Sequence, residues 1–176
     1  MRYTIYRRRF SSGSRFQIHD AGGTLRYEAV PKLLTLDLVK LSFRDVAGGI
    51  HIDIHQIGKG YHAFDLFRDE AKLARVTAIG DRWQRYHVEP RDGPAFDIRT
   101  NFLETRYWYT GERGRFAELT KPYFSWSKLA EIDIREGEDD ALLLASFVAA
   151  QKIADGRKSM IHEALGDRSD RYESLG

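Results

Sequence analysis

The sequence predicts a mainly β protein, a closed antiparallel barrel of about twelve strands around one hydrophobic helix near the C-terminus. Two observations lead to this fold. Between Tyr3 and Ile134, short runs with alternating apolar residues are separated by turn signals about 20–26 residues apart, the length of a hairpin and its connection. From Ala141 to Ala150, every residue except Ser146 is apolar, which indicates a helix with apolar neighbours on nearly every side.

The expected strands are the arms of hairpins. Five turn signals mark them: Asp20 to Gly23, Asp45 to Gly49, Arg68 to Ala71, Arg91 to Pro94 and Gly111 to Gly114. Between two of these signals, Ile52 and Ile54 alternate with His51, Asp53 and His55, a period of two that indicates one buried strand face. Both arms of the hairpins, with the flanking runs, add up to eleven or twelve strands.

We place the helix at residues 138–155. Glu138, Asp139 and Asp140 precede the apolar run, and a helix N-terminus favours acidic and capping residues. Gly156 follows the helix, where glycine is typical of the first residue beyond a C-terminus. The apolar run is too short to cross a bilayer, so we expect protein to surround it.

A barrel is the simplest way to surround such a helix. A barrel of about eight strands is filled by its own side chains, whereas about twelve strands leave room for a helix ~10 Å across. The alternative is a two-sheet sandwich with the helix capping one end, but a capping helix should keep a polar face. We therefore expect one domain over residues 1–156. A polar tail over 157–176 should be partly disordered or form a short helix.

Composition narrows the function classes. The chain has no cysteine, which excludes disulfides and cysteine-ligated metals, and its first residues lack the apolar stretch of a signal peptide. We expect a cytoplasmic protein, with peripheral attachment at a membrane as an option. Residues 1–130 carry 22 Lys and Arg against 15 Asp and Glu, a net charge of +7, whereas residues 131–155 carry 2 against 7, a net charge of −5. A basic body attracts phosphate-rich partners.

Several short stretches, taken in order, resemble the LURP-one-related family, which belongs to the Tubby C-terminal-like superfamily together with phospholipid scramblases. They are Met1 to Ile5, Phe16 to Gly22, Leu41 to Asp45, Tyr123 to Trp126 and Gly137 to Asp140. The resemblance covers roughly residues 1–156 and implies a twelve-stranded barrel around a C-terminal helix. Relatives of the Tubby kind bind phosphoinositide headgroups through basic residues, which makes such binding an expectation by analogy.

The densest basic cluster is a candidate site for anionic lipid or phosphate. It consists of Arg7, Arg8 and Arg9, with Arg15 soon after. Strand alternation places Arg7 and Arg9 on one face and Arg8 on the other. The plainer interpretation is a charged edge strand that resists pairing with another sheet.

A second candidate is a metal site formed by His51, Asp53, His55 and His62. Histidines two residues apart on one strand face can share a metal, and an Asp can orient one of them. The plainer interpretation is a solvated strand face opposite the buried isoleucines.

These patterns favour a binding or scaffold module without catalytic activity or cofactor, whose basic outer surface engages anionic membrane lipids or a protein partner. Two alternatives remain: a metal-binding protein or metal-dependent enzyme centred on the histidines, and a nucleic-acid-binding regulator. The aromatic residues are not interleaved with basic ones as in RNA-reading motifs, so nucleic acid ranks last. The oligomeric state is not predicted.

Overall fold

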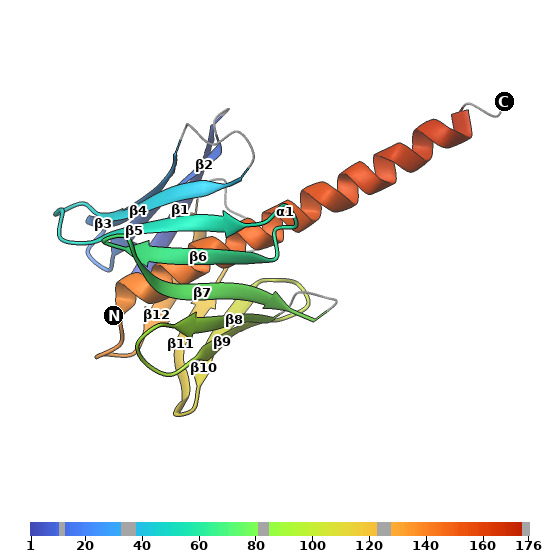
Figure 1. Cartoon of the computed structure of the whole chain (residues 1–176). Helices are drawn as coiled ribbons and strands as arrows, with labels where there is room; N and C mark the ends of the chain where they lie inside the picture. The colour runs from blue at the N-terminus through green and yellow to red at the C-terminus, as the bar shows by residue number, and fades with distance from the viewer. Residues whose placement is uncertain (11–12, 33–37, 81–84, 123–127, 174–176) are drawn as a thin grey trace.

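The computed structural model describes residues 1–10, 13–32, 38–80, 85–122 and 128–173, with the side chains of 1–8, 15–32, 38–80, 85–122 and 129–160. Within these residues, twelve antiparallel strands form one closed barrel around one helix (Figure 1). The strands are β1 Arg2–Phe10, β2 Gly13–Asp20, β3 Leu25–Pro31, β4 Lys40–Asp45, β5 His51–Ile57, β6 Ala63–Arg68, β7 Ala71–Ile79, β8 Arg85–Pro90, β9 Phe96–Thr100, β10 Arg106–Gly111, β11 Gly114–Thr120 and β12 Lys128–Ile134. The helix α1 spans Asp140–Glu173.

The barrel closes because the first and last strands pair. Ile5 of β1 lies opposite Ala130 of β12 on one side and opposite Ile18 of β2 on the other. Every other strand pairs with its two neighbours in the sequence. The expected barrel is confirmed, and the closed sheet rules out the sandwich.

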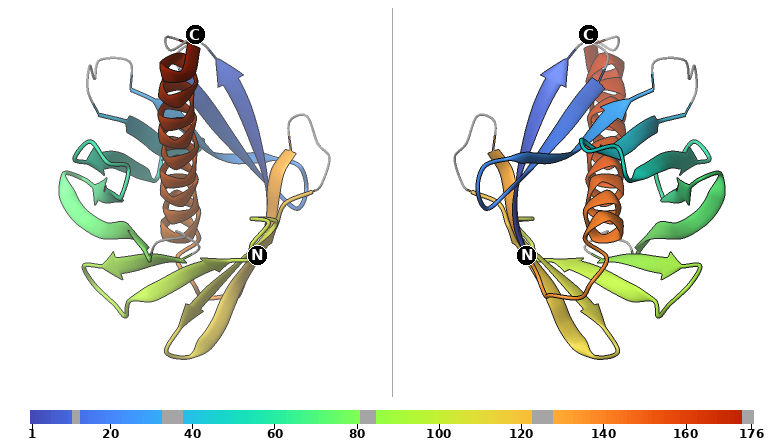
Figure 2. Two further views of the ribbon diagram at one scale, coloured as in Figure 1. Left: turned by 90° about the vertical axis from the view of Figure 1, so that its right-hand side faces the viewer. Right: turned by 90° about the vertical axis from the view of Figure 1, so that its left-hand side faces the viewer.

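Strand alternation sends one set of side chains inward onto the helix. Ile52 and Ile54 are fully buried, whereas His51 on the opposite face is exposed. The helix residues Leu144 and Phe147 are also fully buried, and strands surround α1 on both sides in Figure 2. The core of the barrel is therefore the helix itself.

The helix begins with a side-chain cap. The backbone amide of Leu142 donates to Oδ1 of Asp139 over 3.0 Å, which satisfies one of the amides that a helix N-terminus leaves unpaired. The Tyr3 hydroxyl donates to Asp140 over 2.6 Å, and Arg135 donates to Glu138. The acidic run therefore caps and anchors the helix, as its position predicts, and α1 starts at Asp140 rather than at residue 138.

The predicted end of the helix is wrong. The helix runs through Gly156 to Glu173, so the segment 157–173 is a continuation of the central helix that projects from the barrel (Figure 1). Gly156 serves packing instead of termination, because a Cβ atom there would lie 2.1 Å from Cγ of Tyr61. The glycine is therefore explained by its contact with the aromatic ring and does not mark a helix C-terminus.

Candidate functional site

The basic cluster of β1 and β2 does not form one site. Arg7 points inward and pairs with Asp155 of α1, while Arg8 is exposed and lies opposite Arg15 on β2. Arg15 pairs in turn with Glu28 of β3. The side chain of Arg9 lies outside the described residues. The interpretation of an edge strand is also wrong, because β1 is paired on both sides.

The four metal-site residues are engaged with other groups. The carboxylate of Asp53 contacts Nζ of Lys32 at 2.7 Å and Nε2 of His51 at 3.0 Å. The ring of His55 packs on Phe67 with ring centroids 5.2 Å apart, and burial followed by the charge of Lys40 lowers its pKa. His62 lies on the β5–β6 connection, with its ring directly against Gly60. Among the described residues, no three His, Asp or Glu side chains are placed to hold a metal.

The outer wall between β2 and β9 carries a repeated arrangement of which the two candidates include only Arg15. Three carboxylates there each sit between two or more basic side chains from the same or a neighbouring strand. Glu28 binds Arg15 and Arg44, Asp65 binds Lys72 and Arg75, and Asp97 binds Arg85, Arg99 and His87. We call the six Lys and Arg residues of these clusters the cationic wall: Arg15, Arg44, Lys72, Arg75, Arg85 and Arg99.

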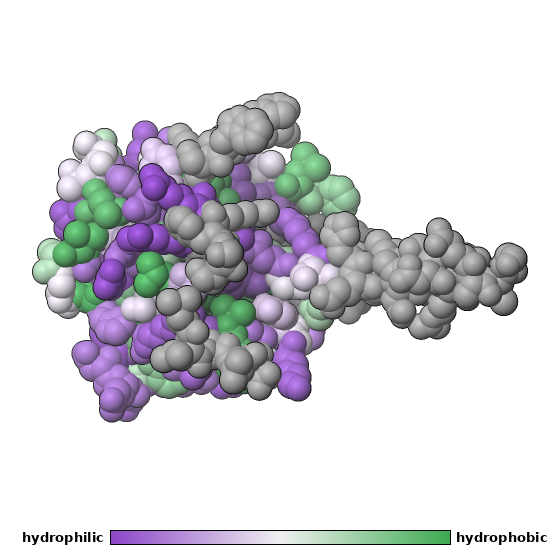
Figure 3. All heavy atoms as spheres, turned by 90° about the horizontal axis from the view of Figure 1, so that it is seen from above, coloured by the Kyte–Doolittle hydropathy of each residue, from purple (hydrophilic) through white to green (hydrophobic). Residues whose placement is uncertain are grey.

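Within each cluster, the negative group is covered and the positive groups reach solvent. The side chains of Glu28 and Asp97 are 7% and 12% exposed, whereas those of Arg44 and Arg99 are 55% and 56% exposed. With histidine neutral, each cluster has two positive charges to one negative charge, a net charge of +1. Solvent therefore meets cations along this wall, and much of the barrel surface seen in Figure 3 is hydrophilic.

The Asp97 cluster shows how the charges hold one another. Nδ1 of His87 lies 2.9 Å from Oδ1 of Asp97, and Nη2 of Arg85 lies 2.7 Å from Oδ2. Burial alone would raise the pKa of Asp97, but the hydrogen bonds from His87 and Arg85 outweigh it and lower the pKa. The ionised carboxylate lets Arg85 and Arg99 sit directly opposite each other on β8 and β9.

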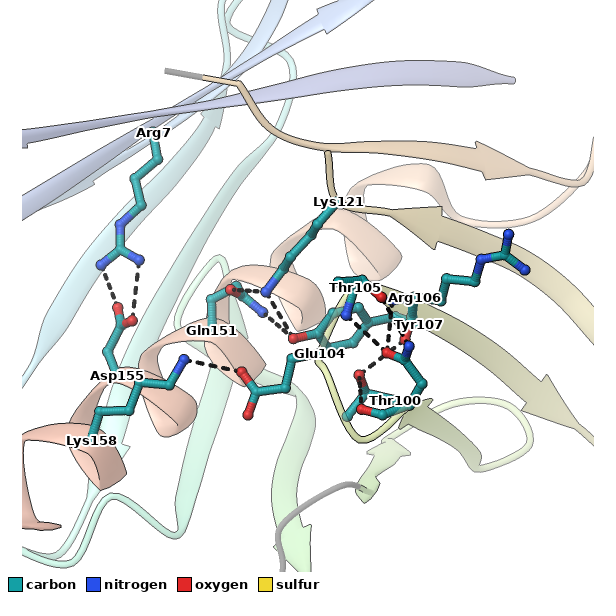
Figure 4. Close-up of polar contacts among 11 residues, drawn as sticks. Arg7, Thr100, Glu104, Thr105, Arg106, Tyr107, Lys121, Gln151, Asp155 and Lys158 are labelled. Atoms are coloured by element: carbon teal, nitrogen blue, oxygen red, sulfur yellow. Dashed lines mark hydrogen bonds and ion pairs between the residues drawn. The ribbon is translucent and has the colours of Figure 1, made fainter. Parts of the chain in front are cut away.

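A different cluster ties the helix to the barrel where α1 leaves it (Figure 4). Nζ of Lys121 donates to the Tyr107 hydroxyl over 2.8 Å and to Oε1 of Gln151 over 2.9 Å. Since both acceptors are neutral, burial dominates and lowers the pKa of Lys121 to about 8. We call this region the helix-exit end; its polar contacts fix the position of α1.

Two ion pairs complete the attachment at the helix-exit end. Arg7 of β1 binds Asp155, and Glu104 of the β9–β10 loop binds Lys158 over 3.1 Å (Figure 4). Both partners on the helix lie within one turn of Gly156. Because residues three positions apart lie on the same side of a helix, the two ion pairs tie one face of α1 to the barrel at the point where it enters solvent.

The opposite end of the barrel holds a cavity of about 500 Å³. Its apolar floor comes from Phe96, Phe116, Leu142 and Leu143, and charged residues of the β8–β9 and β10–β11 turns and of the segment before α1 form its rim. The described residues that line it include no Ser, His or Lys, and its ionisable groups are the carboxylates of Asp92, Glu112, Glu138 and Asp139 with the guanidinium groups of Arg113 and Arg135.

Comparisons with known proteins do not name a relative: no family model matches the chain, and no curated protein matches it either. The resemblance to the LURP-one-related family therefore stays a prediction. Its expected architecture, a twelve-stranded barrel around a C-terminal helix, is the one observed. In the part of the chain that is described, no helix combines the length and apolar character needed to cross a membrane.

Proposed function

We propose that this protein is a non-catalytic binding module that docks on anionic phospholipid headgroups through one part of its cationic wall at a time, because the Glu28 and Asp97 clusters lie on opposite sides of the closed barrel. The observation that carries the proposal is the ratio of two exposed Lys or Arg side chains to one covered carboxylate in the Glu28, Asp65 and Asp97 clusters. Fixed cations that are only half neutralised attract anionic surfaces, and each one near such a bilayer contributes about 1 kcal/mol.

The covered carboxylates also preorganise the cationic wall, because they hold its Lys and Arg side chains in place. Bidentate contacts hold Arg75, whose Nε and Nη2 lie 2.8 and 2.9 Å from the two oxygens of Asp65. A side chain that is already ordered loses less entropy when it meets a headgroup. The resemblance to headgroup-binding relatives of the Tubby kind supports the same class of ligand by analogy.

The clusters allow a clean test, because one cation can be removed from each while another stays on the carboxylate. The variant Arg44→Gln, Lys72→Gln, Arg99→Gln keeps Glu28 paired with Arg15, Asp65 with Arg75 and Asp97 with Arg85. Its matched control is the variant Arg26→Gln, Arg91→Gln, Arg113→Gln. It removes the same number of positive charges at exposed positions that belong to none of the three clusters.

Both variants are compared with the unaltered protein in cosedimentation with vesicles of phosphatidylcholine, with and without phosphatidylserine or a phosphoinositide. We expect binding only to the anionic vesicles. The wall variant should bind at least about fivefold more weakly, the effect of losing a single contact of about 1 kcal/mol, and the control should bind normally. Equal weakening by both variants would show that net charge matters and the wall does not.

A further inference from the structure

The β9–β10 loop, residues Asn101–Thr105, presents two adjacent large hydrophobic side chains to solvent. Phe102 is 79% exposed and Leu103 is 60% exposed. Single exposed hydrophobic residues are common on soluble proteins, but an exposed pair on one loop tip is a small apolar patch. Figure 3 shows a group of hydrophobic atoms at the helix-exit end, beside the base of the projecting helix.

Hydrogen bonds hold this loop in one shape. Oδ1 of Asn101 accepts from the backbone amides of Thr105 and Arg106 over 2.8 and 3.0 Å, and its Nδ2 donates to Oγ1 of Thr105 over 2.8 Å. Glu104 donates its amide to the carbonyl of Asn101 and binds Lys158 of α1 through its carboxylate. The polar groups of the loop face its base, so Phe102 and Leu103 are held outward and do not fold back onto the barrel.

Cations surround the tip. Arg106 directly follows the loop and is exposed. Arg99, near the end of β9, lies two residues before the first residue of the loop and is also exposed. Arg85 lies directly opposite Arg99 on β8, and Lys158 lies against the loop from the helix side. Three acidic groups among the described residues of this region are already paired: Glu104 with Lys158, Asp155 with Arg7, and Asp97 with its arginines.

The direction of the helix selects the side of the barrel that can approach a flat surface. The helix continues out of the barrel in the direction in which it runs through it, and it projects beyond the surrounding loops (Figure 1). The sequence of 157–173 contains eight charged residues, which are costly to place in hydrocarbon. A flat bilayer therefore cannot lie across the helix-exit end, because the projecting helix would have to enter the hydrocarbon. A bilayer on the β8–β10 side would instead lie alongside the helix.

We propose that Phe102 and Leu103 insert into the outer hydrocarbon of an anionic bilayer while Arg85, Arg99 and Arg106 contact its headgroups. This inference rests on the proposed function and deepens it, because it assigns one face of the barrel and one mode of attachment. The apolar tip supplies binding that salt does not screen, and the cations supply the attraction that salt does screen.

The chain has no cysteine, so a single substitution provides a single labelling site for the test. Leu103→Cys and, as control, Val46→Cys are each labelled with an environment-sensitive fluorophore and mixed with vesicles of phosphatidylcholine and phosphatidylserine. Val46 is 54% exposed on the β4–β5 turn at the opposite end. We expect a blue shift at position 103 only, with quenching by lipids that carry a nitroxide on the acyl chain.

A second arm measures how much binding the tip supplies. Phe102→Ser with Leu103→Ser should lower vesicle binding roughly tenfold at high salt, where hydrophobic burial is the remaining attraction, whereas Val46→Ser should not change it. If the protein binds anionic vesicles but the label at 103 stays in water, the insertion is wrong and the proposed function stands. If the unlabelled protein does not bind anionic vesicles even at low salt, both are wrong.

Discussion

Gly156 of the central helix lies directly against the ring of Tyr61, with no room for a Cβ atom between them. Tyr61 comes from the β5–β6 connection and has a positive φ of 49°. A residue of the barrel rim is thus fitted to the one glycine of the buried helix segment. The contact lies within one turn of the ion pairs of Asp155 and Lys158, so it helps to fix where the helix leaves the barrel.

Gly156→Ala should therefore destabilise the protein, although alanine is the better helix former by about 1 kcal/mol. A methyl group that overlaps the Tyr61 ring should lower the free energy of unfolding by about 1–3 kcal/mol. Urea denaturation measures the change. Ser159→Ala, at an exposed position on the same helix, is the control and should be neutral or slightly stabilising.

The cause of that loss can be isolated with a second substitution. Tyr61→Gly removes the ring and suits the positive φ, so adding Gly156→Ala to it should cost nothing further. A full loss from Gly156→Ala in the Tyr61→Gly background would mean that the clash lies elsewhere.

Lys121 should make the protein more stable as the pH rises from 7 to 9.5. Burial lowers its pKa to about 8 in the folded state, while the unfolded chain titrates near 10.4. Between these values the unfolded chain holds a proton that the folded chain has released, so the free energy of unfolding increases with pH, by about 1–2 kcal/mol. Above this window the trend reverses, since burial raises the pKa of Tyr107 and Tyr109 and the unfolded tyrosines ionise first.

The measurement is urea denaturation at a series of pH values for the unaltered protein and for Lys121→Met. The variant should lack the rise, because it has no buried amine to deprotonate. Lys158→Met is the control, since Lys158 is largely exposed, and it should keep the rise. The same rise in the Lys121→Met variant would assign it to another group.

Asp97 should stabilise the protein above pH 4 and lose this effect in acid. Its folded pKa is lowered, so its contribution is complete above the unfolded value of about 3.9 and disappears as the pH falls through the folded value. Asp97→Asn should cost about 1–2 kcal/mol at pH 7, allowing for the exposure of its arginine partners. Its stability should also fall less steeply below pH 4.

The control for that experiment is Glu112→Gln, at an exposed position on the β10–β11 turn. Thermal unfolding across the acid range should give the unaltered profile for this variant. A profile for Asp97→Asn that is parallel to that of the unaltered protein at every pH would contradict the role of the ionised carboxylate.

Arg7 should matter for stability and not for lipid binding. Its side chain is 15% exposed and pairs with Asp155, so Arg7→Met leaves a partly buried carboxylate without this partner, at a cost of about 1–3 kcal/mol. Vesicle binding by the folded variant should equal that of the unaltered protein. Circular dichroism checks that the variant is fully folded. Weaker vesicle binding by the folded variant would mean that Arg7 does contact headgroups.

Much of the fold follows from local patterns in the sequence. The alternation of Ile52 and Ile54 with His51 and Asp53 identifies an inner and an outer face before any pairing is known, and the apolar run from Ala141 identifies the element that fills the barrel. The end of the helix could not be predicted locally, because the glycine at position 156 is required by a packing contact with Tyr61, a residue distant in sequence. Helix propensity alone does not reveal such a contact.

The cationic wall cannot be recognised in the sequence for a similar reason. Asp65 and Asp97 are single acids in their own strands, and Arg85 and Arg99 are fourteen positions apart in the sequence. Only the register of β8 against β9 brings the two arginines opposite each other and beside Asp97. Register between strands depends on the whole sheet, whereas the run Arg7 to Arg9 stood out merely because its residues are consecutive.

The most direct test of the proposed function is the partitioning of the unaltered protein between buffer and vesicles as ionic strength is raised. The cationic wall predicts binding to vesicles that contain phosphatidylserine at low ionic strength, a steady decrease as salt screens the charges, and no binding to pure phosphatidylcholine. Equal partitioning onto neutral and anionic vesicles, or no partitioning at low ionic strength, would contradict it.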